Sequence, residues 1–174
     1  TEDNVGIVAL EEDYLRTLDG IMSIEADSKL FIDSVRDEFN PTLIKQMYDK
    51  LFNNDRVWVH AHFGATDIEE IFSKLRFMIV GCDCKWVIVD HLHMLVAASV
   101  EGDERRTLDS IMHRLRCIVE ETGAGMILVS PLRRVEGHVG REHGVSVGLN
   151  HSRGSQSIAM LSDGVLALEH HQQE

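Results

Sequence analysis

Cysteine and proline are both scarce in this sequence, and a long apolar run is absent. The three cysteines, two of them in Cys82-Asp83-Cys84, provide neither a disulfide framework nor the spacing of a zinc site. A reducing, intracellular environment is therefore expected. No apolar stretch approaches the roughly 20 residues that a membrane-spanning helix requires, and no signal peptide is evident at the start of the chain. We expect no association with a membrane.

Basic residues are outnumbered: 17 lysines and arginines face 29 acidic residues, for a formal net charge of −12. A compact domain that grips duplex DNA by bulk charge is usually basic. Any contact with nucleic acid must therefore be local and must come from a few loops.

A glycine-rich phosphate loop is also lacking, because no segment matches G-x-x-x-x-G-K-[ST]. In nucleotide-hydrolysing proteins the backbone amides and the lysine of such a loop hold the phosphates. Any nucleotide site within these 174 residues is therefore incomplete.

What is present is an apolar run, Trp86 to Val89, that stops abruptly at Asp90. A continuous apolar run of this kind is typical of a strand buried on both faces of a parallel sheet. An Asp at the carboxyl end of such a strand lies on the edge where open α/β sheets bind ligands. In nucleotide-hydrolysing proteins this Asp holds the Mg²⁺ that accompanies the phosphates. Alternatively, Asp90 caps the strand or a following turn.

The remaining apolar pattern alternates between strand-like and helix-like segments. Strands are predicted at 5–10, 56–62, 86–90, 125–130 and 164–169. Helices are predicted at about 12–25, at about 40–51, at about 66–81 (opened by a capping box of Thr66 and Glu69), between the polar stretch 100–103 and Gly123, and at 156–161. Residues 132–150 are rich in glycine and charge and predict a long loop. This order predicts one α/β domain with a mostly parallel sheet.

Carboxylates follow two of the predicted strands, Glu11-Glu12 after the first and Asp90 after the third. If the strands are parallel, these ends converge on one edge of the sheet. One carboxylate could then hold Mg²⁺ while another orients and deprotonates an attacking water. Alternatively, Glu11 and Glu12 are first-turn acids of the following helix, favoured by its dipole.

Two histidine pairs, His60-x-His62 and His91-x-His93, have a spacing that would place both imidazoles on one face of a strand. No third metal ligand is evident. An independent metal hydrolase built on these pairs is the weakest of the functional interpretations.

The densest basic cluster lies in the segment 132–141 and includes Arg133, Arg134 and Arg141. It comes directly after a predicted strand, on the ligand-binding edge. Arginines on a glycine-rich loop suit a phosphate backbone, but they equally suit plain solvation.

The order of these segments resembles the helicase domain of the T-odd phage primase–helicases, within the DnaB and Twinkle group of RecA-like ring ATPases. The stretches that carry the resemblance run in family order over nearly all of the chain and are VGIVALEE, CKWVIVDHL, GDERRTLDSIMHRLR, GAGMILVS, SRGSQSIAMLSDGVLALE and the closing Gln172-Gln173. The resemblance implies a three-layer RecA-like fold with a mostly parallel sheet.

The resemblance also implies roles for single residues. Glu11 matches the general base that activates water, and Asp90 matches the Mg²⁺-associated acid. Arg153, in the Arg-Gly-Ser turn, matches a conformational or subunit-contact residue near the nucleotide.

Two segments match loops that face the central channel of such rings. Residues 93–104 match the first, and residues 132–147 match the second, which holds single-stranded DNA. This makes Arg133, Arg134 and Arg141 the implied phosphate contacts.

Three features depart from the family pattern. Pro131 stands where the family carries a polar phosphate sensor, usually His, and its side chain can make no hydrogen bond. His170 and Ser152 stand where relatives have Arg and Leu.

The strand that carries the phosphate loop would precede Thr1 and the arginine finger would follow Glu174, so residues 1–174 are expected to be a partial RecA-like ATPase domain. Lack of a central strand is expected to leave exposed apolar strand edges, through which the fragment dimerises or repacks.

The leading interpretation is a portion of a replicative 5′-to-3′ DNA helicase that couples nucleoside triphosphate hydrolysis to movement on single-stranded DNA. The full-length protein would use Mg²⁺ with ATP or dTTP, assemble as a hexameric or heptameric ring, and work in the cytoplasm of a phage-infected bacterium. The fragment alone is expected to be inactive and to bind no cofactor tightly. The alternative is a non-catalytic RecA-like module for assembly or DNA contact, with Pro131 as its best support.

Overall fold

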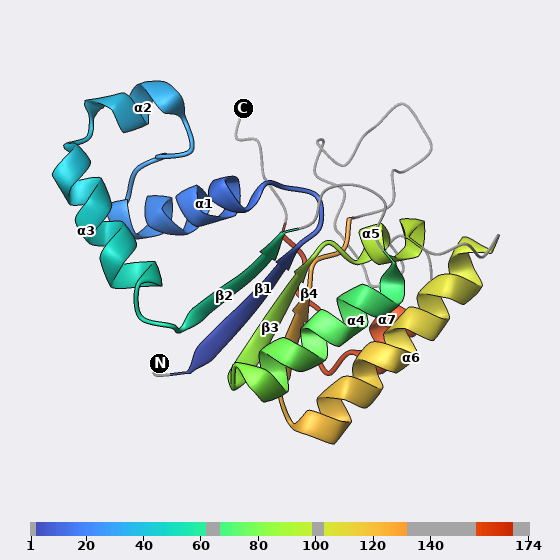
Figure 1. The fold of residues 1–174 in the computed structure, drawn as a ribbon. Coiled ribbons are helices and arrows are strands. Elements are labelled where there is room, and N and C mark those ends of the chain that lie inside the picture. Colours follow the sequence, from blue (N-terminus) through green and yellow to red (C-terminus); the bar gives the residue numbers. More distant parts are fainter. Residues whose placement is uncertain (1–2, 62–66, 99–102, 132–155, 169–174) are drawn as a thin grey trace, which may run out of the picture.

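The computed structural model describes residues 3–61, 67–98, 103–131 and 156–168 (Figure 1). Its centre is a sheet of four parallel strands in the order β2-β1-β3-β4. The strands are β1 (Asn4–Ala9), β2 (Val57–Ala61), β3 (Cys84–Asp90) and β4 (Gly125–Leu128). The predicted α/β class and parallel sheet are therefore confirmed.

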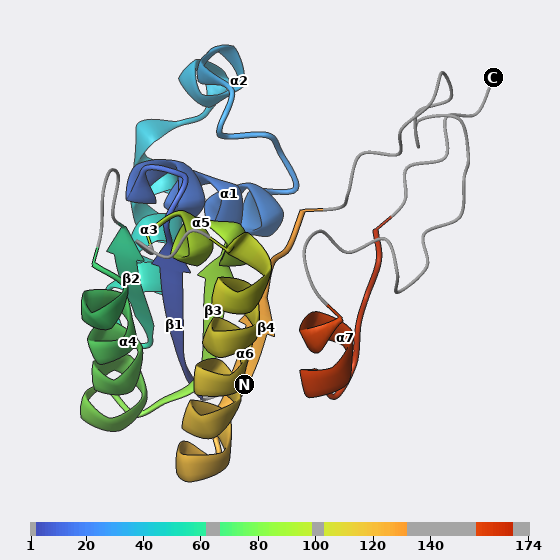
Figure 2. The same ribbon diagram turned by 90° about the vertical axis from the view of Figure 1, so that its right-hand side faces the viewer.

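Helices connect the strands and lie on both sides of the sheet (Figures 1 and 2). They are α1 (Tyr14–Ala26), α2 (Asp33–Glu38), α3 (Pro41–Phe52), α4 (Ile68–Arg76) with the π-helical turn η1 (Phe77–Gly81), α5 (Leu92–Ala97), α6 (Glu104–Thr122) and α7 (Ser157–Leu161). None of these described helices has both the length and the apolar content needed to cross a bilayer.

One face of the sheet forms the main core, under α4, α5 and α6. Val8, Val87 and Val89 point toward this face and are fully buried. The helices contribute apolar side chains at helical spacing, as in α6, where the buried positions are Leu108, Ile111, Met112, Leu115 and Ile118. Glycine at position 6 allows Met78 of η1 to approach the backbone of β1, because a Cβ there would lie 2.9 Å from the Met78 sulfur.

The opposite face is only partly covered. Ile7 and Ala9 of β1 are buried on the side where α1 and α3 lie (Figure 1). On the β3–β4 half, by contrast, Trp86, Ile127 and Val129 remain exposed. Because β3 pairs with both β1 and β4, the edges of the described sheet are β2 and β4. This exposed apolar surface therefore lies on the β3–β4 half of one sheet face. The exposure of strand edges expected from the sequence stays a prediction.

Helix ends follow the expected local chemistry. Asn40 caps α3 by accepting a hydrogen bond from Thr42 N, with Pro41 in the first turn, and Gly123 ends α6 in the left-handed conformation. The predicted cap of α4 was one residue early: Asp67 is the N-cap and accepts from Glu69 N at 2.9 Å. Thr66 lies outside the described residues.

Three expectations about elements were wrong. Helix α2 was missed because none of its residues is buried, so it carries no apolar stripe. Helix α5 was missed because its short apolar sequence continues the apolar character of β3 without a period of its own. The predicted last strand is not formed over residues 164–168, where Leu166 and Leu168 are 98% and 94% exposed and pair with no neighbouring strand.

Candidate functional site

The carboxyl ends of β1 and β3 lie side by side at one edge of the sheet. Ala9 is in register with Asp90, and Leu10 N donates to the Asp90 carbonyl oxygen at 2.7 Å. Glu11 follows one residue later. The parallel pairing thus brings the two predicted catalytic carboxylates, Glu11 and Asp90, to the same place.

The Glu11-Glu12 pair does not belong to the following helix. Asp13 is the N-cap of α1, which has no acidic residue in its first turn. Glu12 lies 3.9 Å from Arg16 in an exposed ion pair. The alternative interpretation of Glu11 and Glu12 as first-turn helix acids is therefore wrong.

Asp90 suits a role in holding Mg²⁺. Its side chain is half-buried and makes no hydrogen bond or ion pair with any of the residues described. The N-cap of α5 is His91, and no side-chain hydrogen bond caps that helix. Asp90 therefore does not cap the helix that follows it. Mg²⁺ is commonly bound through one or two carboxylates together with substrate phosphates, and a free carboxylate at a strand end fits that pattern.

The structure adds a residue that sequence reasoning did not assign to this edge. His91 Nε2 lies 2.9 Å from Glu11 Oε2, within hydrogen-bond distance. The imidazole is mostly buried, whereas the Glu11 side chain is 61% exposed. The only signal in the sequence was the position of His91, directly after the strand-end Asp90.

The His91-x-His93 pair does not lie on one strand, because β3 ends at Asp90 and His93 belongs to α5. The two rings meet edge to face, with centroids 6.3 Å apart. His60 is on β2, and His62 falls outside the described residues. Within the part of the chain that is described, no group of three or more His, Cys, Asp or Glu side chains could hold a metal ion.

Pro131 lies just beyond β4, at the same edge. Val129 is hydrogen-bonded to the end of β3 and the start of α5. Its N–H donates to Val89 O at 3.0 Å, and its carbonyl oxygen accepts from Leu92 N at 2.9 Å. Pro131 is half-buried. The hydroxyl of its neighbour Ser130 is buried and has no hydrogen-bond partner among the residues that the structure describes.

The implied DNA contacts cannot be placed. Arg133, Arg134, Arg141 and Arg153 all lie outside the described residues, as do Ser152 and His170. Much of the first implied channel loop, 93–104, is not a loop: its first five residues belong to α5, where His93, Leu95 and Val96 are buried.

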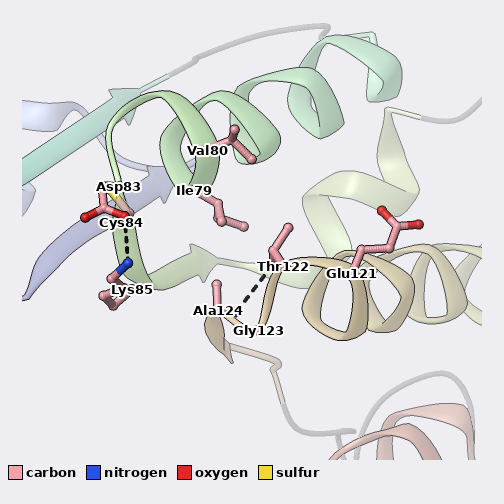
Figure 3. A pocket seen from close by; sticks show the side chains of 9 residues that line it. All are labelled: Ile79, Val80, Asp83, Cys84, Lys85, Glu121, Thr122, Gly123 and Ala124. Atoms are coloured by element: carbon pink, nitrogen blue, oxygen red, sulfur yellow. Dashed lines mark hydrogen bonds and ion pairs between the residues drawn. The ribbon is translucent and has the colours of Figure 1, made fainter.

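A separate cavity of about 360 Å³ lies at the opposite ends of the strands from Glu11 and Asp90, where β3 begins and α6 ends (Figure 3). Lys85 and Asp83 pair at 2.6 Å on the β3 side of this cavity (Figure 3), and this hydrogen bond raises the pKa of Lys85. Burial, with smaller contributions from Cys82 and Asp83, raises the pKa of the Cys84 thiol to about 11. The thiol therefore stays protonated at neutral pH and is a poor nucleophile or ligand.

Comparisons with known proteins agree with this arrangement. No protein-family model matches the chain. The chain is similar to a protein described as a DNA helicase/primase of Enterobacteria phage T3, with 29% identity over 174 residues that cover 97% of this chain and 30% of the phage protein. The chain thus spans less than a third of the length of that relative.

Among solved structures, the fold is similar to that of a KaiC-like protein from the hyperthermophilic archaeon Pyrococcus horikoshii. The TM-score is 0.51 at 14% identity, over 74% of this chain and 47% of the archaeal chain. A likeness at this identity bears on the fold alone. Together, the two comparisons confirm that the chain has a RecA-like α/β fold and resembles the phage helicase–primases over nearly its whole length.

Proposed function

We propose that this chain is part of an NTP-dependent DNA helicase that moves 5′ to 3′ along single-stranded DNA. The observation that carries the proposal is the convergence of Glu11 and Asp90 at the neighbouring carboxyl ends of β1 and β3. The similarity to a phage DNA helicase/primase supports the same function. Single-stranded DNA and further copies of the chain, in a hexameric or heptameric ring, are the proposed partners, in the cytoplasm of an infected bacterium.

The chemistry assigned to the two carboxylates is phosphoryl transfer to water. Bound Mg²⁺ would neutralise charge on the phosphates of ATP or dTTP. Asp90, which pairs with no side chain among the described residues, would hold this ion. Glu11 would orient the attacking water and accept its proton as the new P–O bond forms and the bond to the leaving diphosphate breaks. Arg133, Arg134 and Arg141 would contact DNA phosphates, and Arg153 would respond to the nucleotide or to a neighbouring subunit.

The 174-residue polypeptide alone is proposed to hydrolyse nucleotide at no significant rate, because it contains no phosphate-binding loop. Mg²⁺-dependent turnover by this polypeptide, abolished by Glu11→Gln, would contradict the proposal.

Strand separation by the full-length protein tests the function. Forked DNA substrates with only a 5′ or only a 3′ single-stranded tail are incubated with Mg²⁺ and ATP or dTTP. Unwinding that needs the 5′ tail is the expected result. No unwinding of either substrate, with the protein folded and bound to DNA, would refute the assignment.

The DNA contacts are tested separately by fluorescence anisotropy with a labelled single strand. The Arg133→Ala/Arg134→Ala variant of the full-length protein is compared with the wild type across a salt series. Loss of two phosphate contacts should weaken binding and make the slope against log salt shallower by about 1.4 for a single strand. An unchanged slope and affinity would remove these arginines from the DNA interface.

Pro131 supports a second candidate, a non-catalytic RecA-like module for assembly or DNA contact. Proline at this position offers no side-chain hydrogen bond to a phosphate. The sequence of the full-length protein upstream of Thr1 separates the two. A G-x-x-x-x-G-K-[ST] motif there favours the enzyme, and a degenerate loop favours the module.

A further inference from the structure

We propose that His91 is a positioning residue that fixes the Glu11 carboxylate for its work on the attacking water. This inference rests on the proposed function, in which Glu11 is the general base. It goes beyond that function because it assigns the orientation of the base to a side chain on a different strand end.

The contact itself is the first support. His91 Nε2 lies 2.9 Å from Glu11 Oε2. Facing a carboxylate, which can only accept, the imidazole must present an N–H from Nε2. The other nitrogen, Nδ1, is buried and has no hydrogen-bond partner among the described residues. An N–H on Nε2, which faces Glu11, is therefore better placed than one on the buried Nδ1.

The second support is that the His91 side chain is held by its surroundings, whereas the Glu11 side chain is exposed. Glu11 follows β1 on a short connection to α1, and no other side chain pairs with it in the part of the chain that the structure describes. Left alone, an exposed Glu samples many rotamers. His91 is fixed by its mostly buried ring and by the edge-to-face contact with His93.

The backbone around His91 is also fixed. Its neighbours on both sides are tied to other strands: Asp90 O accepts from Leu10 N at 2.7 Å, and Leu92 N donates to Val129 O at 2.9 Å. The position of the Glu11 carboxylate is thus restrained, through His91, by the carboxyl ends of β1, β3 and β4. Misplacement of a catalytic group by about 1 Å can lower a rate by a factor of about 100, so restraint of this kind bears directly on turnover.

The test is steady-state hydrolysis of ATP or dTTP by the full-length protein in the presence of single-stranded DNA. We expect His91→Ala to lower kcat about tenfold through misplacement of the base, with a change of less than about twofold in KM, since uniform substrate binding is untouched. His91→Gln, whose amide N–H reaches a similar position to Nε2, should restore most of the rate. His113→Ala, on the exposed side of α6, is the control for loss of a histidine and should leave both constants unchanged.

The double variant identifies the route of the effect. If His91 acts only through Glu11, adding His91→Ala to Glu11→Gln should lower the residual rate no further. A tenfold loss in both backgrounds would show that His91 acts elsewhere and would overturn the inference. So would an unchanged kcat in His91→Ala, or a failure of His91→Gln to recover when both variants show wild-type thermal unfolding.

Failure of the proposed function looks different. In that case Glu11→Gln itself would leave hydrolysis intact, whatever the His91 variants do. Loss of activity in Glu11→Gln together with full activity in His91→Ala would reject the positioning role alone.

Discussion

At the scale of single residues, the candidate site is defined by the residues at which β1 and β3 end. That Glu11 and Asp90 lie at one edge could be predicted because each follows an apolar run, and parallel strands end at one edge. Their catalytic roles stay a prediction. The contact between His91 and Glu11 could not be predicted. Its i, i+2 spacing to His93 indicated a shared strand face, but the chain turns into α5 directly after Asp90, which separates the two rings and leaves His91 against Glu11.

Gly125 illustrates how tightly one residue can be constrained. A Cβ at this position would lie 2.3 Å from the Trp86 ring, which covers the start of β4. Gly125→Ala should therefore lower the free energy of unfolding by about 1–3 kcal/mol through overpacking, as measured by urea unfolding. Gly20→Ala is the matched control, because a Cβ in that part of α1 meets nothing within 4 Å. Equal stability of the two variants would contradict the packing described.

At the scale of elements, the long helices and the short α7 were predicted, whereas the short helices α2 and α5 were not. Helix α6 buries one stripe at helical spacing, so its sequence alone predicts it. Segment 164–168 shows the opposite case. Its apolar residues predict a strand, but a strand exists only through hydrogen bonds to a neighbour, and no described strand pairs with it.

Helices α4 and α6 are joined by Arg114. It makes two hydrogen bonds of 2.7 Å to the Glu69 carboxylate, and its guanidinium lies 3.8 Å from the centre of the Phe72 ring. The hydrogen bonds from Arg114 are the main cause that lowers the pKa of Glu69. The pair therefore stabilises the fold at pH values above the unfolded pKa of about 4.5, and this contribution is lost as the pH falls through the lower, folded pKa.

This linkage predicts a pH-dependent mutational effect. Arg114→Leu should destabilise the protein more at pH 7 than at pH 3, as measured by urea unfolding at both values. The difference should be small, because Glu69 is exposed to solvent. In a Glu69→Gln background the cost of Arg114→Leu should no longer vary with pH. Persistence of the variation there would assign it to another group.

At the scale of the whole molecule, the sheet is covered unevenly. Trp86, Ile127 and Val129 form an exposed apolar surface on the β3–β4 half of one face. Surfaces of this kind favour association. We therefore expect the 174-residue polypeptide to self-associate through this face, in line with the dimer expected from the sequence.

Sedimentation velocity across a concentration series tests this expectation. Ile127→Lys/Val129→Lys should weaken self-association at least about tenfold, the equivalent of about 1.4 kcal/mol. Leu43→Lys replaces an equally exposed apolar side chain on α3 and should leave it unchanged. A wild-type polypeptide that stays monomeric at high concentration would contradict the expectation.

We propose that the edge formed by the carboxyl ends of β1 and β3 is a site of nucleotide hydrolysis, with Glu11 as its base. The most direct measurement is DNA-stimulated hydrolysis of ATP or dTTP by the full-length protein, comparing Glu11→Gln with Glu12→Gln. Glu12 is the exposed neighbour of Glu11 and forms an ion pair with Arg16. Removal of a general base should lower kcat by a factor of about 100 to 10,000 in Glu11→Gln, with Glu12→Gln close to wild type. Equal activity of the two variants would contradict the claim.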